Sequence, residues 1–252
     1  MKKKKYKALL LDIDGTIVQK GYENLPTVAV KRAIASLHKR GIPVCLATGR
    51  TIQHAKRIID VLHITNACIL NGGAAIYDPK IKKTIHSFSF DEKRKQKLIT
   101  IGSALRERFL VCTTQGEFEY TGQDFSQKDV TSFYFIHLQQ EEIELYTRGL
   151  AEVHNLTLHL ITRGTFDGMP VIIATDADTT KIKAIHHLFE YMKIHAEDIV
   201  AVGDEENDLP MLTAVGMSVA MGNAPDNVKA QVKYIAPSVY EDGLVDVIKK
   251  FF

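Results

Sequence analysis

The sequence has few cysteines, little net charge and no long apolar run. The three cysteines are scattered and odd in number, which argues against a disulfide framework and favours a reducing cytoplasm; they are Cys45, Cys68 and Cys112. A formal net charge of +2 is too small to indicate nucleic acid or a membrane surface as a partner. No apolar run approaches the length that spans a bilayer, and two aspartates interrupt the first one, so no signal peptide is expected.

What remains is the composition of an ordinary globular protein. The chain has 252 residues, of which 45% are hydrophobic and 25% charged. This length suits one large domain or two modest ones. The lysine run at residues 2–5 is expected to be a solvated tail.

Strand-like and helix-like segments alternate in the first and last thirds of the chain. Strands are expected at residues 6–11, 43–48, 67–70, 199–203 and 217–220. Helices are expected at residues 27–40, 52–62, 181–192, 209–215 and 243–251. This alternation predicts an α/β fold with a parallel sheet and right-handed crossovers.

The rhythm changes between about residues 80 and 178, where the pattern becomes α+β with a hairpin at 110–114 and 117–121. Phe133, Tyr134 and Phe135 are expected in the core of this insert, on one face. The loop 163–168 can be either a substrate-facing loop or a plain hairpin connection. We therefore predict a core of residues 1–79 and 179–252 with a separate insert at 80–178, and such boundaries hold to about four residues.

The most informative segment follows the first predicted strand. Asp12 and Asp14 come directly after the apolar run 6–11, and Gly15 permits a sharp turn. Open α/β sheets bind ligands at the carboxyl ends of their strands. Two acids in such a place repel each other unless a cation or a shared proton relieves them. The segment predicts a metal site, an acid–base pair, or both.

Three further segments fall at strand ends or helix starts of the predicted core, so their side chains are expected to converge on the edge that holds Asp12. They are Ala47–Arg50, Lys181 and Gly203–Asp208. Clustered carboxylates suit Mg²⁺ and phosphate substrates. A hydroxyl and a lysine beside such a cation can bind phosphoryl oxygens, and a carboxylate can attack phosphorus to form an acyl phosphate.

In this order, the four segments resemble the four motifs of the haloacid dehalogenase (HAD) superfamily. More narrowly, the chain is similar to the Cof-type phosphatases (subclass IIB), in which a large α+β cap of C2 type lies between the second and third motifs. Residues 70–73 and 220–224 also match this subgroup. One departure is Ile182 after Lys181, where the subgroup usually has glycine. The resemblance implies a Rossmann-like three-layer α/β/α core with an inserted cap domain.

The resemblance also implies residue roles. Asp12 would be the nucleophile and a Mg²⁺ ligand, and Asp14 would act as acid and base while its backbone carbonyl binds Mg²⁺. Thr48 and Lys181 would hold the phosphoryl oxygens. Asp204 would be the third protein ligand to the metal.

Other residues would support these. Asp208 would belong to the metal site behind the direct ligands, and Asn207 could contact phosphate or metal-bound water. Further residues would lie near the bound phosphate: Gly49, Arg50, Asn71, Gly72 and Asn223.

The sequence thus predicts a Mg²⁺-dependent phosphatase that hydrolyses a small phosphorylated metabolite, such as a sugar phosphate or a phosphorylated cofactor precursor, through an aspartyl-phosphate at Asp12. Alternatives are a phosphomutase or phosphotransferase of the same superfamily, a non-catalytic phosphometabolite binder, and a receiver-like signalling protein. No nucleic acid or membrane partner is expected, and the location is expected to be cytoplasmic. A monomer and a homodimer are both open, and no motif names the substrate.

Overall fold

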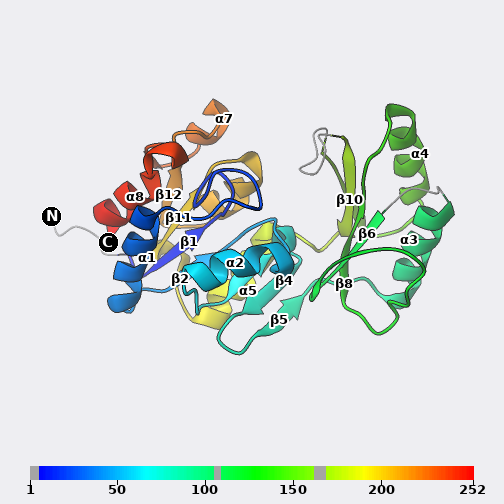
Figure 1. The fold of residues 1–252 in the computed structure, drawn as a ribbon, viewed down its shortest axis with the longest axis horizontal. Helices are drawn as coiled ribbons and strands as arrows, with labels where there is room; N and C mark the ends of the chain where they lie inside the picture. Colours follow the sequence, from blue (N-terminus) through cyan, green and yellow to red (C-terminus); the bar gives the residue numbers. More distant parts are fainter. Residues whose placement is uncertain (1–5, 105–108, 162–168) are drawn as a thin grey trace.

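The computed structural model describes residues 6–104, 109–161 and 169–252, which form three sheets (Figure 1). The first sheet has the order β13-β12-β11-β1-β2, with strands at Tyr234–Ile235, Met217–Ala220, Ile199–Gly203, Ala8–Leu11 and Val44–Leu46. A small sheet joins β3 (Cys68–Leu70), β4 (Ala75–Asp78) and β5 (Lys83–Ser87). The third sheet has the order β7-β6-β8-β10-β9, with strands at Gly116–Glu119, Phe109–Thr113, Val130–Phe135, Val171–Asp176 and Leu156–Ile161.

The first sheet is parallel and buried on both faces. β1 pairs in parallel with β11 and with β2, so that Leu9 lies beside both Val200 and Val44. Leu9 and Leu11 enter one apolar cluster, whereas Ala8 and Leu10 enter another on the opposite face, because successive side chains of a strand alternate. This confirms the expected parallel α/β core.

Helices cover both faces of this sheet, which makes three layers. One face is covered by α1 (Val28–Lys39), α2 (Ile52–Val61) and α8 (Gly243–Phe251). The other is covered by α5 (Lys181–Met192), α6 (Leu209–Thr213) and α7 (Asp226–Lys229). Their bounds lie close to those predicted for five of them, whereas α7 and the short strand β13 were not expected.

The third sheet packs α3 (Glu92–Ala104) and α4 (Gln140–Leu150) against one face. We call this sheet with its two helices the cap, and the other two sheets with their helices the core; Figure 1 shows them side by side. Phe133 and Phe135 lie in the cap's apolar cluster, but Tyr134 does not. The expectation that all three share one face is wrong, because the middle residue of a strand triplet points to the opposite side.

The predicted domain boundaries stay a prediction. β5 lies beyond residue 79, yet it pairs with β4 in the small sheet. The sequence also predicts a helix at residues 91–108, and its last four residues lie outside the described residues, as do the lysine run 2–5 and the loop 163–168.

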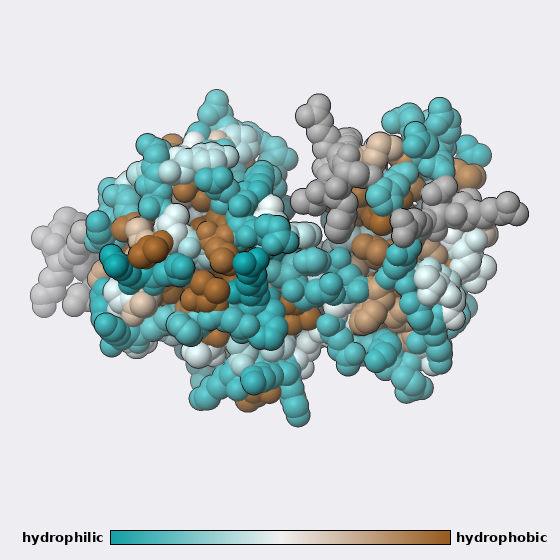
Figure 2. Space-filling model, viewed as in Figure 1, coloured by the Kyte–Doolittle hydropathy of each residue, from teal (hydrophilic) through white to brown (hydrophobic). Residues whose placement is uncertain are grey.

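The surface is mostly hydrophilic on the face shown in Figure 2. Hydrophilic side chains cover most of the face in Figure 2, and the apolar side chains form separate patches. Within the described ranges, no helix combines the length and the apolar character needed to cross a bilayer.

Candidate active site

The four sequence motifs meet at the carboxyl edge of the parallel sheet. Asp12 follows β1, Thr48 follows β2, and Asp204 follows β11. Lys181 is the first residue of α5, whose N-terminus is capped by the Thr180 hydroxyl, which accepts a hydrogen bond from the Lys183 backbone N–H at 3.2 Å. The edge thus collects carboxylates, a hydroxyl and an ammonium, as the sequence predicts.

Three carboxylates form a buried cluster. Asp12, Asp204 and Asp208 each offer an oxygen, and these oxygens lie within 4.8 Å of one another. Their residues are only 7%, 2% and 0% exposed. The Lys181 ammonium lies 2.6 Å from Asp208 Oδ1, so a buried positive charge contacts the cluster.

Asp208 is already satisfied by protein groups. Its Oδ2 accepts hydrogen bonds from the backbone N–H groups of Asp204 at 3.0 Å and Glu205 at 3.2 Å, and its Oδ1 accepts from Lys181. These contacts hold the loop after β11 and orient Lys181. The Asp12 carboxylate, by contrast, accepts no hydrogen bond from the residues that the structure describes, so its oxygens are the most available to a ligand.

The electrostatics of this cluster are those of a cation site. Burial raises the pKa of Asp12 well above its usual range, Asp208 adds to the shift, and Lys181 opposes it. Burial, with the charge of Asp208, raises the pKa of Asp204 to about 7. Burial alone would lower the pKa of Lys181, but Asp208 and Asp12 raise it overall, so the lysine stays charged. Buried oxygen donors that repel one another fit a hard divalent cation such as Mg²⁺.

The side chain of Asp14 is held away from this cluster by Arg50. The guanidinium donates from Nε to Asp14 Oδ2 at 2.8 Å and from Nη2 to Oδ1 at 2.7 Å. Arg50 is 3% exposed and also donates to the Gly21 carbonyl at 3.1 Å. The resemblance implied a place for Arg50 near phosphate; in the structure its fork is occupied by the carboxylate of Asp14.

Two glycines allow the close approach of the motifs. Gly15 has a φ of +78°, and a Cβ there would lie 2.1 Å from Asp204 Oδ2. Gly73 has a φ of +110°, and a Cβ there would lie 2.9 Å from the Lys181 backbone nitrogen. A side chain at either position would push a motif residue out of place.

Asp204 has three polar neighbours, and the sequence did not single out two of them, Thr16 and Lys20, as functional. Thr16 Oγ1 donates to Asp204 Oδ1 at 3.4 Å, and the Lys20 ammonium lies 3.9 Å from Oδ2. Asn223, which the resemblance placed near phosphate, donates to Asp204 Oδ2 at 3.2 Å and to the Gly15 carbonyl at 2.9 Å. Lys20 lies in an irregular loop without periodicity, so no sequence signal could have found it.

The remaining predicted residues lie around this edge in different settings. Thr48 is buried, and its Oγ1 accepts from the Arg50 backbone N–H at 3.2 Å. Gly49 is exposed on the loop after β2, and Asn207 is exposed in the short 3-10 helix Glu206–Asp208. Gly72 follows Asn71 in a tight turn with a φ of +65°.

Asn71 faces the cap. Its Nδ2 donates to Thr131 Oγ1 at 2.8 Å and to Ser132 Oγ at 3.0 Å, and its Oδ1 accepts from the Tyr134 hydroxyl at 3.0 Å. Burial raises the pKa of Tyr134 well above its usual range, so this phenol remains a neutral donor. The period-two alternation of residues 133–135 is the signal that could have placed Tyr134 on the site face.

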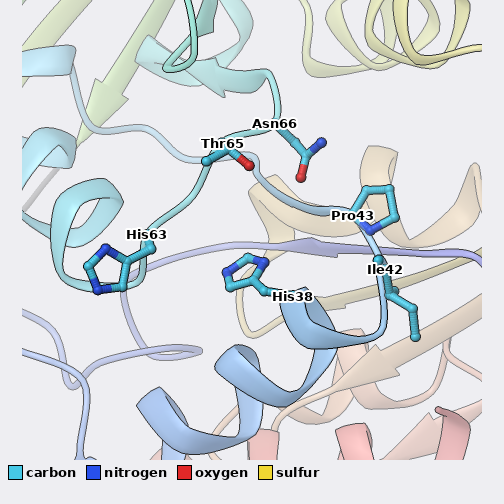
Figure 3. A pocket seen from close by; sticks show the side chains of 7 residues that line it. His38, Ile42, Pro43, His63, Thr65 and Asn66 are labelled. Atoms are coloured by element: carbon cyan, nitrogen blue, oxygen red, sulfur yellow. The ribbon is translucent and has the colours of Figure 1, made fainter.

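A pocket elsewhere on the core does not belong to this site. It has a volume of about 310 Å³ and is lined by residues that precede β2 and β3, together with the ends of α1 and α2. His38, Ile42, His63 and Asn66 are among them (Figure 3). This is the amino-end edge of the strands, opposite the carboxylates. The buried acidic cluster, rather than this pocket, is the candidate active site, because ligands of such sheets bind at the carboxyl edge.

Known proteins are similar to this chain in both sequence and fold. Residues 9–161 and 123–248 match the model of a family described as haloacid dehalogenase-like hydrolases. The chain is 26% identical over 248 residues to a phosphoglycolate phosphatase of Methanosarcina acetivorans, covering 97% of this chain and 96% of that one. It is 24% identical over 256 residues to the 5-amino-6-(5-phospho-D-ribitylamino)uracil phosphatase of Bacillus subtilis, covering 96% and 94%.

Solved structures of this family have the same fold as this chain. A haloacid dehalogenase-like hydrolase from Bacteroides thetaiotaomicron superposes with a TM-score of 0.84 at 19% identity, over 98% of this chain and all (100%) of that chain. A HAD subclass IIB sugar phosphatase superposes with a TM-score of 0.73 at 20% identity, over 97% and 98%. The chain therefore belongs to the haloacid dehalogenase-like hydrolases of the Cof type, and the two sequence relatives named above are phosphatases.

Proposed function

We propose that this enzyme is a Mg²⁺-dependent phosphatase that hydrolyses the phosphomonoester of a small metabolite through an aspartyl-phosphate on Asp12. The observation that carries the proposal is the buried cluster of Asp12, Asp204 and Asp208 with Lys181 against it. Such a cluster is unfavourable without a cation, and its lysine can face the oxygens of a phosphate.

In the first step a carboxylate oxygen of Asp12 attacks phosphorus, and the bond from phosphorus to the ester oxygen breaks. Asp14 gives its proton to the departing oxygen, which leaves as an alcohol. Lys181 and the Thr48 hydroxyl hold the phosphoryl oxygens while negative charge shifts toward the leaving group.

In the second step Asp14, now ionised, takes a proton from water as the water oxygen attacks phosphorus. The acyl phosphate bond breaks, phosphate is released and the Asp12 carboxylate is restored. The side chain of Asp14 lies on Arg50, outside the acidic cluster, so it is kept apart from the carboxylates that would hold the metal.

The metal would be held by Asp12 and Asp204 with the backbone carbonyl of Asp14, and Asp208 would orient this set from behind. When bound, Mg²⁺ supplies positive charge that lowers the pKa of the nucleophile and screens it from the phosphate dianion.

The substrate class rests on the relatives. One is a phosphoglycolate phosphatase and the other acts on a phosphorylated ribitylaminouracil. We infer a small phosphorylated metabolite, such as a sugar phosphate or a phosphorylated cofactor precursor. A cytoplasmic location is part of the proposal, and it is supported by the three free, buried cysteines.

The test is a turnover screen over sugar phosphates, phosphoglycolate and phosphorylated cofactor precursors, with Mg²⁺ and with EDTA. We expect phosphate release from at least one compound, and EDTA should reduce it to background. Asp12→Asn should lower kcat by at least about 10³-fold, since it removes the nucleophile. An Asp12→Asn variant as active as the parent, or turnover that is equal in EDTA, would contradict the proposal.

A further inference from the structure

The side chain of Asn71 is fully committed to the cap. Its amide has two N–H donors, and these go to Thr131 Oγ1 and Ser132 Oγ of β8 at 2.8 and 3.0 Å. Its carbonyl oxygen accepts from the Tyr134 hydroxyl at 3.0 Å. Asn71 is 7% exposed, so water cannot readily replace these partners. In this arrangement the amide has no N–H left for a phosphate oxygen.

The backbone at Asn71 is tied to the segment 48–51 of the second motif. The Asn71 backbone N–H donates to the Arg50 carbonyl at 2.9 Å, and the Gly72 N–H donates to the Thr48 carbonyl at 3.1 Å. Asn71 has a φ of +50°, a left-handed conformation that asparagine adopts more readily than other non-glycine residues. The turn that contacts the cap through Asn71 is therefore also hydrogen-bonded to the backbone of Thr48, the proposed phosphate-binding threonine.

A second contact joins the cap to the other end of this segment. The Glu117 carboxylate of β7 accepts from Thr51 Oγ1 at 2.8 Å and lies 3.5 Å from His54 Nε2. Its side chain is 8% exposed, and its backbone N–H donates to Gln53 Oε1 at 3.3 Å. Helix α2 begins at Ile52, so the carboxylate lies beside the positive end of the helix dipole.

We propose that Asn71 and Glu117 are cap-docking residues that hold the cap on the second motif and thereby position Thr48. Asn71 is then a positioning residue and not a phosphate ligand. That Thr48 binds phosphate rests on the proposed function, whereas the docking contacts do not depend on it. The cap needs no contact with the substrate to influence the phosphate site, because Glu117 contacts residues 51–54 directly and the backbone at Asn71 is bonded to residues 48 and 50.

Docking can be measured without activity. A donor and acceptor dye on Lys39→Cys and Glu144→Cys, both exposed, report the distance from core to cap, and the native cysteines are at most 2% exposed and should stay unlabelled. Tyr134→Phe and Glu117→Gln should each raise the ratio of undocked to docked molecules by about 2- to 10-fold, the range for one lost hydrogen bond. Asn71→Gly keeps the left-handed backbone and should raise the ratio further.

Matched controls are Tyr240→Phe and Glu141→Gln, which alter exposed residues away from the contact and should leave the transfer efficiency unchanged. Unchanged transfer efficiency in Tyr134→Phe, Glu117→Gln and Asn71→Gly would overturn the docking role.

Inorganic phosphate separates the two roles of Asn71. If Asn71 only positions Thr48, Asn71→Gly should lower kcat for the best substrate of the screen and should weaken inhibition by phosphate only in proportion to the loss of docking, as Tyr134→Phe does. Tyr134→Phe should lower kcat in the same direction without removing the amide. A phosphate constant weakened 10-fold or more in Asn71→Gly, with docking intact, would make Asn71 a ligand and overturn the inference. Should no phosphomonoester be hydrolysed, the dye measurement still decides the docking role.

Discussion

At the scale of single residues, the ion pair between Arg50 and Asp14 sets where the proposed acid–base carboxyl lies. A guanidinium contacts both carboxylate oxygens through two N–H groups in one plane, which an ammonium cannot reproduce. Arg50→Lys should therefore lower kcat by roughly 10²-fold, the loss typical of a misplaced catalytic group, with a small change in KM. Steady-state kinetics test this.

The matched control for this change is Arg57→Lys, since Arg57 is an exposed arginine that pairs with Glu23 at 3.2 Å. Its kinetics should equal those of the parent. Equal kinetics in Arg50→Lys as well would show that the bidentate pair is not needed.

Gly15 provides a second prediction at this scale. Gly15→Ala places a methyl group in a left-handed backbone and against Asp204, whereas Gly41→Ala has a similar φ of +69° with nothing within 4 Å. Both should lose roughly 1–2 kcal/mol of unfolding free energy for the backbone. Only Gly15→Ala should lose more than this and also its Mg²⁺-dependent turnover. Urea unfolding and kinetics of both variants measure the difference, and equal losses would contradict it.

At the scale of elements, the N-terminus of α5 carries Lys181 into the site, and Thr180 caps it. The sequence departs from the subgroup pattern at Ile182, but the N-cap residue Thr180 and Lys181 are both in place. Thr180→Ala should lose about 1 kcal/mol of stability and, because the first turn frays, several-fold in kcat. Thr180→Ser should retain both the stability and the kcat of the parent, because serine also offers a hydroxyl.

Thr27 caps α1 in the same way, through a hydrogen bond of 3.2 Å from the Val30 N–H, but it lies away from the site. Thr27→Ala should lose comparable stability with kcat unchanged. Thermal unfolding and kinetics of both alanine variants separate the effect of the helix cap from that of the lysine. If Thr180→Ala keeps the kcat of the parent, the N-cap hydrogen bond of Thr180 is not required to hold Lys181.

At the scale of the whole molecule, the acidic cluster couples stability to pH and to metal. The pKa of Asp204 is about 7 in the folded protein and 3.8 is its ordinary value, so the folded state holds a proton more tightly than the unfolded one. Without metal, this stabilisation is complete below about pH 4 and is lost as pH rises to about 7, on the order of 4 kcal/mol. The buried Asp12 shifts in the same direction.

The measurement is the Tm from pH 5 to 8 in EDTA, compared with Asp204→Asn. The variant's Tm minus that of the parent should increase across this range, because the asparagine carries no charge. Mg²⁺ should raise the Tm of the parent more at pH 8 than at pH 5 and should have little effect on the variant. A difference between the two proteins that does not vary with pH would contradict the prediction.

Local features of the sequence predict most of the core. Apolar spacing and caps place α5 and α8 at their observed bounds, and the motifs predict that Asp12, Asp204, Asp208 and Lys181 gather at one edge. These features are readable because burial of a helix or strand face depends on spacing along the chain. The four motifs are also sufficient to indicate the family.

Only the tertiary structure decides what the polar side chains bind. Arg50 pairs with Asp14, and the Asn71 side chain contacts the cap instead of facing the predicted phosphate site. In both cases the partners lie far apart in the sequence and offer complementary donors and acceptors. Tyr134 reaches Asn71 across 63 positions of sequence, since the docked sheet brings its hydroxyl there. Hydrogen bonds need both partners within about 3 Å, and no spacing in the sequence encodes that distance.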